Sequence, residues 1–572
     1  MNVYSEVKEI IIETINNKFK NIDKSLLEKI TCERPKDSKY GDVSSNVVLI
    51  ILKNTQLKVD DLAKNLIIDL KKNSLFKDIQ FQKPGFINMK IEEGYWLRLL
   101  EYIWKNQKKF GFKDVGKGRK INVEFVSANP TGPLHIGHVR GAVFGDVLSN
   151  LLKKNGYNVT KEYYVNDLGN QIENLLNTVR FHIENYKNNT NLELEKDMYQ
   201  GVYLKELAID IFKKHSDILE SQNESLFREI VLASNINLIK QDLKRLGVLF
   251  DKFSSEKKLH EDGIVEKTIK LLKTKNLIYN GKLEKPKGNE DKEWSAKEQT
   301  LFKSKSFGDN DDRALKKHDG SWTYFASDIA YHYDKAKRGF EEIINIWGAD
   351  HAGYIKRVSS AIQAFDFDNL KFSVKLCQIV NIIDNRKVIK MSKRAGNFIL
   401  LSEVLDGIGS AALRFFMLIR KNDAHLDFDL EKCLDETREN PIFYVQYANA
   451  RISSVKRLMK QKNLLIKERN PILINYIKSD EEMKIIKSLS TWPKVMEAAV
   501  LYREPHRLVF YLIELASQLH SFWNIGKSNS QYKIISEENI NLTNARLILL
   551  EAVQSILKNG LDILSIKPVD KM

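Results

Sequence analysis

The stretch INVEFVSANPTGPLHIGH, residues 121–138, decides the fold of this 572-residue chain. Residues 121–126 are largely apolar and β-rich, and turn formers fill residues 127–133. Residues 134–152 then have the pattern of a helix. The sequence therefore predicts a strand, a loop and a helix in succession, which is the unit from which a parallel sheet with crossover helices is built.

Two histidines stand at the start of the predicted helix. A helix that begins there directs its unpaired N–H groups and its dipole at the loop, which suits an anion. Gly137 lacks the Cβ that would block close approach, and the imidazoles of His135 and His138 share one face and can both donate to phosphate oxygens. Such a four-residue string arises by chance in about one chain of this kind in a hundred or fewer. Alone, it only suggests a site for nucleotide phosphates.

A second, basic string lies far downstream, after a predicted strand over residues 376–383. Its members are Lys390, Met391, Ser392, Lys393 and Arg394. The default interpretation of such a string is a solvated basic turn. Its occurrence in one chain with the histidine string, in this order, favours a phosphate-binding function instead, because two lysines and an arginine can hold a leaving pyrophosphate.

Together, the two strings resemble the signature pair of class I aminoacyl-tRNA synthetases. Further strings narrow the resemblance to the arginyl-tRNA synthetases, and it runs nearly end to end. They are EFVSAN at 124–129, YYVNDLGNQ at 163–171, YFASDIAYH at 324–332 and WGADH at 347–351. The resemblance implies a ligase that activates L-arginine with ATP to arginyl-adenylate and pyrophosphate. The same enzyme would then transfer arginine to the terminal ribose of tRNA(Arg), at its 2′-OH.

The chemistry of activation needs no protein nucleophile, since the arginine carboxylate itself attacks the α-phosphorus of ATP. Catalysis is then positioning and stabilisation of charge. We expect the catalytic residues to be His135, His138, Lys390 and Lys393. The expected ATP-binding residues are Pro130, Gly132, His135, Gly137, His138, Gly348, Lys390, Met391, Ser392 and Lys393. Magnesium would travel with ATP, without a dedicated metal site in the protein.

A pocket for arginine must neutralise a planar, permanently charged guanidinium, which carboxylates do bidentately. Glu124 stands at the end of a strand beside the nucleotide site, where α/β sheets bind ligands. Tyr324 and Asp328 are four residues apart and would share one face of a helix, although a tyrosine at this spacing is more often a packing residue. The resemblance implies arginine contacts for Glu124, Ser127, Asn129, Tyr324, Asp328 and Asp350. It assigns Ser127 and Asn129 to the α-amino or carboxylate end, and leaves open whether Asp350 serves arginine or the ATP ribose.

The length is too great for one core and suggests about three domains. We expect a multidomain α/β protein with an N-terminal α+β domain at 1–112 and a Rossmann-type parallel-sheet catalytic domain at 113–440. The catalytic domain would carry a lysine-rich surface insertion over residues 282–305 and a helical stem. Residues 441–572 are expected to form an all-α anticodon-binding bundle. The resemblance implies that the first domain contacts tRNA, while its residues alone fit a generic packing domain equally well.

The bundle is predicted from helical patterns over residues 442–458, 483–501, 505–523 and 544–564. Several of its aromatic side chains could stack on unpaired RNA bases. The candidates are Phe443, Tyr444, Tyr447 and Trp523. Apolar stripes at helical spacing are usually packing, so most of these rings are expected in the bundle core.

Composition limits the function classes. A net charge of +16 is compatible with a polyanionic partner such as tRNA, but lysine is abundant throughout, so this evidence is weak. Three widely spaced cysteines exclude a cysteine-rich zinc knuckle and favour reduced, packed thiols. The start lacks the pattern of a signal peptide, and no apolar run reaches membrane-spanning length. We expect a cytoplasmic protein, most simply a monomer, without membrane or DNA partners.

Two other functions compete with this interpretation. A different class I synthetase or a smaller nucleotidyltransferase would share the histidine string, but a nucleotidyltransferase would not need the helical C-terminal third. An RNA-binding relative that has lost the chemistry would not need intact histidines and lysines. Consumption of ATP separates the enzymes from this last alternative.

Overall fold

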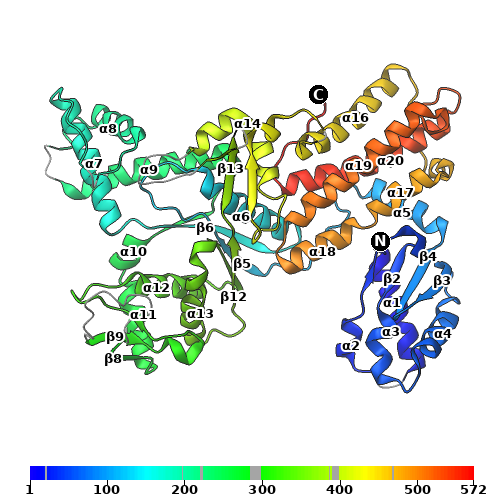
Figure 1. The fold of residues 1–572 in the computed structure, drawn as a ribbon, viewed down its shortest axis with the longest axis horizontal. Helices are drawn as coiled ribbons and strands as arrows, with labels where there is room; N and C mark the ends of the chain where they lie inside the picture. The colour runs from blue at the N-terminus through cyan, green and yellow to red at the C-terminus, as the bar shows by residue number, and fades with distance from the viewer. Residues whose placement is uncertain are drawn as a thin grey trace.

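The fold is described from a computed structural model of the chain (Figure 1). The residues that the structure describes are 1–19, 22–195, 198–219, 223–283, 298–384, 387–389, 399–437, 439–466 and 469–572. The predicted residues Lys390, Met391, Ser392 and Lys393 lie outside them. Within the described residues, no helix is long and apolar enough to cross a membrane. The three cysteines are buried and free, as predicted.

The N-terminal domain is a small α+β unit, as predicted. Its antiparallel sheet has the strand order β1-β2-β4-β3. The strands are β1 (Cys32–Glu33), β2 (Val43–Ser45), β3 (Phe76–Gln82) and β4 (Phe86–Ile91). The same unit contains the α-helices α1 (Val3–Lys18), α2 (Lys24–Glu28), α3 (Val47–Ile51) and α4 (Val59–Leu70). Helix α5 (Glu93–Lys105) then leads to the C-terminal bundle, where it contacts α17 and α20. In Figure 1 this blue unit lies below the bundle.

The central core is a parallel sheet of five strands in the order β12-β11-β5-β6-β7. The strands are β5 (Lys120–Glu124), β6 (Asn158–Val165), β7 (Lys252–Ser255), β11 (Glu342–Gly348) and β12 (Lys371–Cys377). The first strand, β5, lies in the middle, with later strands added on both sides. The order therefore reverses between β5 and β11, and an open α/β sheet binds ligands at the carboxyl ends of the strands beside such a point.

Helix α6 (Ile136–Lys154) follows β5 and packs against β5, β6 and β11. Helices α9 (Glu224–Leu246), α12 (Tyr324–Lys337) and α13 (Ile355–Ala364) lie in the later crossover connections. The predicted strand over 121–126 ends earlier than expected, at Glu124. The reason is local, since Val126 and Ser127 have φ values of 68° and 42°, and a left-handed backbone cannot continue a strand.

The prediction of one strand over residues 376–383 is wrong. Strand β12 ends at Cys377, and a separate strand, β13 (Val380–Asp384), lies in a second sheet of order β14-β13-β15 with β14 (Lys387–Ile389) and β15 (Leu426–Asp429). Between them, the backbone N–H of Gln378 donates to the carbonyl of Asn422 at 2.8 Å. This bond takes the chain out of the first sheet. The lysine string therefore follows the β13–β14 hairpin and not the last parallel strand.

The C-terminal region is a helical bundle, as predicted. Its helices are α16 (Pro441–Gln461), α17 (Asp480–Leu489), α18 (Trp492–Tyr502), α19 (His506–Ser528) and α20 (Ile540–Ile563). The single helix predicted over 483–501 is wrong, because α17 ends at Leu489 and α18 begins at Trp492. Pro493 lies in the first turn of α18, where a missing N–H costs nothing, so the sequence favours a new helix start there.

The predicted insertion over 282–305 lies partly outside the described residues. Its described end forms β9 (Glu298–Phe302), which pairs with β8 (Ile278–Lys282) and buries Phe302 completely. That end of the insertion is therefore part of a packed core and not a surface loop.

Candidate active site at the carboxyl ends of the parallel strands

The histidine string caps helix α6. His135 is the N-cap residue, and its Nδ1 accepts a hydrogen bond from the N–H of Gly137 at 3.1 Å. The Nδ1 of His138 accepts one from the N–H of His135 at 3.3 Å, and the two ring centroids are 3.9 Å apart. A neutral imidazole that accepts at Nδ1 carries its proton on Nε2. Both rings therefore have an N–H donor at the positive end of the α6 dipole, as an anion site requires.

The chain that follows the lysine string is fixed beside this helix start. The N–H of Ile136 donates to the carbonyl of Ile399 at 3.2 Å, and the N–H of Leu401 donates to the carbonyl of Leu134 at 2.9 Å. His135 and Leu400 form an antiparallel bridge. Thus one end of the segment that contains Lys393 is held at the histidine turn, although Lys393 itself lies outside the described residues.

A small cavity of about 60 Å³ adjoins the histidines. It brings together Asn129, Gly132, His135 and His138, all predicted site residues, with Tyr203, which the sequence analysis missed. Gly132 has φ +158°, and a Cβ on it would lie 2.3 Å from the hydroxyl oxygen of Tyr203. That hydroxyl donates to the carbonyl of Thr131 at 2.8 Å. A side chain at position 132 would therefore collide with Tyr203, and the predicted ATP residue Pro130, in the same loop, is buried.

The loop after β5 is held by side-chain hydrogen bonds. The Ser127 hydroxyl donates to Glu124 Oε1 at 3.1 Å and accepts from the N–H of Tyr164 at 3.0 Å. Asn129 Nδ2 donates to Gln171 Oε1 at 2.6 Å, and the Tyr163 hydroxyl donates to the carbonyl of Ala128 at 2.8 Å. These bonds stabilise the left-handed backbone at Val126 and Ser127, which would otherwise be unfavourable for a β-branched residue.

Three carboxylates act electrostatically on the hydroxyl of Tyr164. Asp328, from α12, and Glu124, from the end of β5, were predicted; Glu256, the first residue of α10 (Glu256–Glu261), was not. All three raise the pKa of the Tyr164 hydroxyl after burial, and Glu124 and Glu256 both raise that of Asp328. Glu124 and Glu256 are 6% and 4% exposed. A site with this much buried negative charge favours a cationic ligand.

Burial raises the pKa of the Asp328 carboxyl to about 7. The Tyr354 hydroxyl, which donates to Asp328 Oδ2 at 2.6 Å, opposes this shift, whereas the neighbouring carboxylates add to it. The pKa of Glu256 is also raised by burial, in part offset by hydrogen bonds from Ser327 and Tyr164. Among the described residues neither carboxylate forms an ion pair, although the charge of Lys335 lowers the pKa of Asp328, and perturbed groups of this kind concentrate at functional sites.

Glu124 differs from the other two carboxylates. Its Oε2 forms an ion pair with Lys335, whose side chain is completely buried. Lys335 also donates to Asn345 Oδ1 at 3.2 Å, and Asn345 in turn contacts His332. Burial lowers the pKa of His332 to about 3, so this imidazole is neutral. The sequence analysis missed Lys335, because only the fold brings α12 against the end of β5.

Tyr324 begins α12, one turn before Asp328, so the predicted helical spacing is confirmed. Tyr324 is 58% exposed, which is more typical of a ligand-contacting surface than of a packing residue. Gly348 ends β11, and Asp350 and His351 follow it on the exposed surface, 3.5 Å apart between Oδ2 and Nε2. The same turn carries Tyr354, the partner of Asp328, and so joins the end of β11 to the carboxylate cluster.

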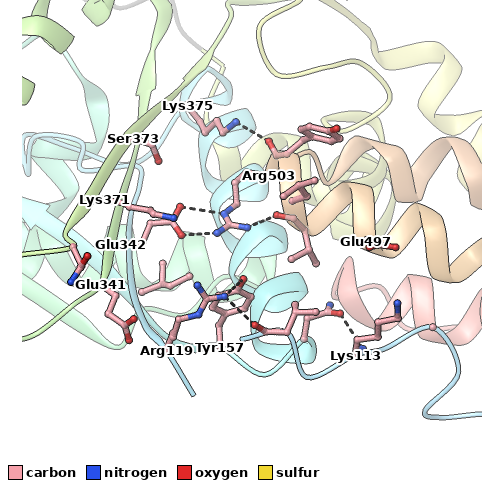
Figure 2. A pocket seen from close by; sticks show the side chains of 18 of the residues that line it. Lys113, Arg119, Tyr157, Glu341, Glu342, Lys371, Ser373, Lys375, Glu497 and Arg503 are labelled. Carbon is pink, nitrogen blue, oxygen red and sulfur yellow. Dashed lines mark hydrogen bonds and ion pairs between the residues drawn. The ribbon is translucent and has the colours of Figure 1, made fainter. Parts of the chain in front are cut away.

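A much larger cavity, of about 750 Å³, lies at the other end of the sheet (Figure 2). It is lined by the amino ends of β5, β11 and β12 and by α18, and it contains no predicted site residue. Its central ion pair joins Arg503 Nη2 to Glu342 Oε2 at 2.6 Å, while Lys375 Nζ donates to the carbonyl of Tyr502 at 2.9 Å. These contacts fasten the bundle to the sheet.

Chemically, the carboxyl ends of the strands offer an anion site at the start of α6 and a cation site around Asp328 and Glu256. The described residues contain no group of three or more His, Cys, Asp or Glu side chains that could hold a metal ion. The arrangement therefore fits a ligand pair of opposite charge, one with phosphates and one with a cationic group.

Three family models match the chain. They are the arginyl tRNA synthetase N terminal domain at residues 5–91, the tRNA synthetases class I (R) catalytic domain at 100–453 and the DALR anticodon binding domain at 445–572. Curated relatives include arginine–tRNA ligases from Wolbachia sp. subsp. Brugia malayi, 44% identical over 578 residues, and from Rickettsia bellii, 42% identical over 583 residues. Each alignment covers 100% of both chains.

Solved structures agree with these matches. A Campylobacter jejuni structure described as an arginyl-tRNA synthetase has a TM-score of 0.71 and 32% identity, and covers 84% of this chain and 100% of its own. Thermus thermophilus arginyl-tRNA synthetase has a TM-score of 0.73 over 100% of both chains, at 18% identity, and so supports the fold alone.

Proposed function

The chain belongs to the arginyl-tRNA synthetase family of class I, and from this premise we propose which residues carry each step of its reaction. It is an arginine–tRNA ligase that uses ATP. Membership in the family establishes arginine, ATP and tRNA as the substrates, whereas the roles of individual residues are proposed from the geometry of the site. The observation that carries them is the pair of carboxylates, Asp328 and Glu256, which form no ion pair among the described residues and lie, like the histidine-capped start of α6, at the carboxyl ends of the parallel strands.

We propose that the guanidinium of arginine binds between Asp328 and Glu256. A guanidinium has five donors in a fixed plane, so it can satisfy two carboxylates at once. Tyr324 borders the same site from one turn earlier on α12. Glu124 lines the pocket but already has Lys335 as its counter-ion, so it supplies less of the charge that arginine must match.

Ser127 and Asn129 are proposed to contact the α-amino or carboxylate end of arginine. They lie on the loop between the carboxylate cluster and the histidines, so arginine bound there would direct its carboxylate toward the α6 start. Asp350 lies at the exposed end of β11 and is proposed as a further polar contact, either to arginine or to the ATP ribose.

The activation step is proposed to occur at the α6 start. The arginine carboxylate attacks the α-phosphorus of ATP and pyrophosphate leaves. His135 and His138 would donate from Nε2 to the phosphoryl oxygens, and Lys390 and Lys393 would stabilise the leaving pyrophosphate. Bound ATP would carry Mg²⁺, whose charge assists the same departure. The remaining proposed ATP contacts are Pro130, Gly132, Gly137, Gly348, Met391 and Ser392.

Transfer then requires the terminal ribose of tRNA, whose 2′-OH attacks the adenylate carbonyl and expels AMP.

In the bundle, the Arg451 guanidinium lies 4.2 Å from the ring centroid of Tyr447 and 5.1 Å from that of Trp523. Tyr447 is 36% exposed, and Phe443 and Tyr444 are partly buried next to it. We propose that this group stacks on unpaired bases of the tRNA.

From the resemblance to the family we also propose domain boundaries at residues 112 and 440, a monomeric state and a cytoplasmic location. The N-terminal domain would contact the tRNA outside its anticodon.

The test is charging of total tRNA with each of the twenty amino acids in the presence of ATP and magnesium. Arginine alone should be attached. A parallel measurement of pyrophosphate exchange without tRNA shows whether activation needs tRNA. Attachment of another amino acid would overturn the assignment of Asp328 and Glu256, and failure to consume ATP would favour the RNA-binding alternative.

A further inference from the structure

Lys335 is a completely buried charge in the wall of the active site, and its ammonium group has three defined partners. It forms an ion pair with Glu124, donates to Asn345 Oδ1 at 3.2 Å and lies 4.3 Å from the ring centroid of Tyr331. A buried lysine is costly unless each of its protons is satisfied. These contacts meet that requirement and hold Glu124 in one orientation.

The orientation of Glu124 determines what its second oxygen does. With Oε2 bound to Lys335, Oε1 faces Ser127 and accepts its hydroxyl proton at 3.1 Å. The Ser127 oxygen in turn accepts from the N–H of Tyr164, so the hydroxyl is fixed on both sides. A continuous chain of contacts therefore runs from Lys335 to the loop after β5.

That loop has an unfavourable backbone. Val126 and Ser127 both have positive φ, and Val126 is β-branched, so the left-handed conformation is stable only if neighbouring contacts impose it. The Glu124–Ser127 hydrogen bond is one of the contacts that a strained residue makes directly, together with the bond from the N–H of Tyr164. Loss of the Lys335 charge would leave Glu124 buried without a counter-ion, and its side chain would turn toward another partner.

We propose that Lys335 and Glu124 act as a positioning pair, which holds the loop of Ser127 and Asn129 in the conformation that receives the amino-acid end of arginine. The pair does not bind the guanidinium, which is left to Asp328 and Glu256. This inference rests on the proposed arginine site. It predicts that disruption of the pair harms recognition of the α-amino and carboxylate groups but not of the guanidinium tail.

The experiment replaces the pair with neutral side chains of similar size, in the double variant Lys335→Met with Glu124→Gln. Charging is measured with tRNA and ATP, together with inhibition by n-butylguanidine, which has the tail of arginine but no amino-acid end. The KM for arginine should rise about tenfold, whereas the inhibition constant of n-butylguanidine should stay within about twofold. Lys337→Met, an exposed lysine of the same helix, is the matched control and should change neither value.

Ser127→Ala leaves the buried pair intact and keeps the proposal testable if the double variant does not fold. It should reproduce the same split between arginine and n-butylguanidine. Combining it with the double variant should add little, which separates positioning by the pair from the direct contact also proposed for Ser127. Equal weakening of both ligands, or no change in either, would overturn the proposal. If Asp328→Asn leaves inhibition by n-butylguanidine unchanged, the proposed guanidinium site is wrong, which is a separate outcome from failure of the positioning pair.

Discussion

The two ends of the parallel sheet differ in what their charges do. At the amino ends of β5, β11 and β12, the cavity of about 750 Å³ is built around an ion pair between Arg503 and Glu342. At the carboxyl ends the cavity beside the histidines is about 60 Å³, yet Asp328 and Glu256 are carboxylates without ion-pair partners in the described chain. Charge that the fold has not neutralised, and not cavity volume, marks where a charged ligand belongs.

The variant Asp328→Asn should have the largest effect in a test of this difference between the two ends of the sheet. We expect kcat/KM for arginine to fall about a thousandfold, because the guanidinium would lose a charged, bidentate partner in a buried site. Discrimination of arginine against citrulline, its neutral isostere, should fall with it. The unfolding temperature should be nearly unchanged, because ionising the Asp328 carboxyl in the empty site is costly and its removal takes away little stabilisation. Unchanged discrimination would show that another carboxylate selects arginine.

Glu256→Gln tests the carboxylate that the sequence analysis missed. Asp328 would still pair with one side of the guanidinium, so the expected loss in kcat/KM for arginine is smaller, about thirtyfold. The loss should lie mainly in KM, because the contact is made in the ground state as well as in the transition state. Asp262→Asn, close in sequence but exposed beyond the end of α10, is the control. A fall in kcat with an unchanged KM would instead place Glu256 in the chemical step.

The pH dependence of arginine binding tests the same difference between the two ends of the sheet. The pKa of Asp328 in the empty site is about 7, and a bound guanidinium favours the ionised form, so binding releases a proton below that pH. Arginine affinity should therefore be complete above pH 7 and fall by up to about tenfold per pH unit below it. Calorimetry in buffers of different ionisation enthalpy measures the released proton. Asp328→Asn should remove this dependence, and its persistence would assign the titration to another group.

Without arginine, the raised pKa of Asp328 affects the stability of the protein, and its pH dependence is opposite to that of arginine affinity. The folded state holds the Asp328 proton more tightly than the unfolded state, where the usual value is 3.8. The contribution of this carboxyl to stability therefore decreases as the pH rises from about 4 to about 7. Arginine should raise the unfolding temperature more at pH 8 than at pH 6.

The smallest effect is expected at the amino ends of the strands. Arg503→Ala removes the ion pair with Glu342, both members of which are largely buried, and should lower the free energy of unfolding by about 1 kcal/mol or somewhat more. Its kcat/KM for arginine should stay within about twofold, since the site lies at the other end of the strands. A large loss of arginine activity without loss of stability would make the large cavity part of the function.

Local patterns predicted much of the fold and part of the site. The start of α6 at the histidines, the helical spacing of Tyr324 and Asp328 and the parallel sheet all follow from short stretches of sequence. Glu256 and Lys335 could not be found in this way, because their roles depend on α10 and α12 packing against the end of β5. The break between α17 and α18 had a local signal, Pro493, that the periodicity of apolar residues obscured.

The most direct test of the central claim is a crystal structure of the enzyme with arginine bound. The guanidinium nitrogens should lie within about 3 Å of carboxylate oxygens of Asp328 and Glu256, with the amino-acid end toward Ser127 and the start of α6. A guanidinium bound at the amino ends of the strands, or to Glu124 in place of Lys335, would contradict the account.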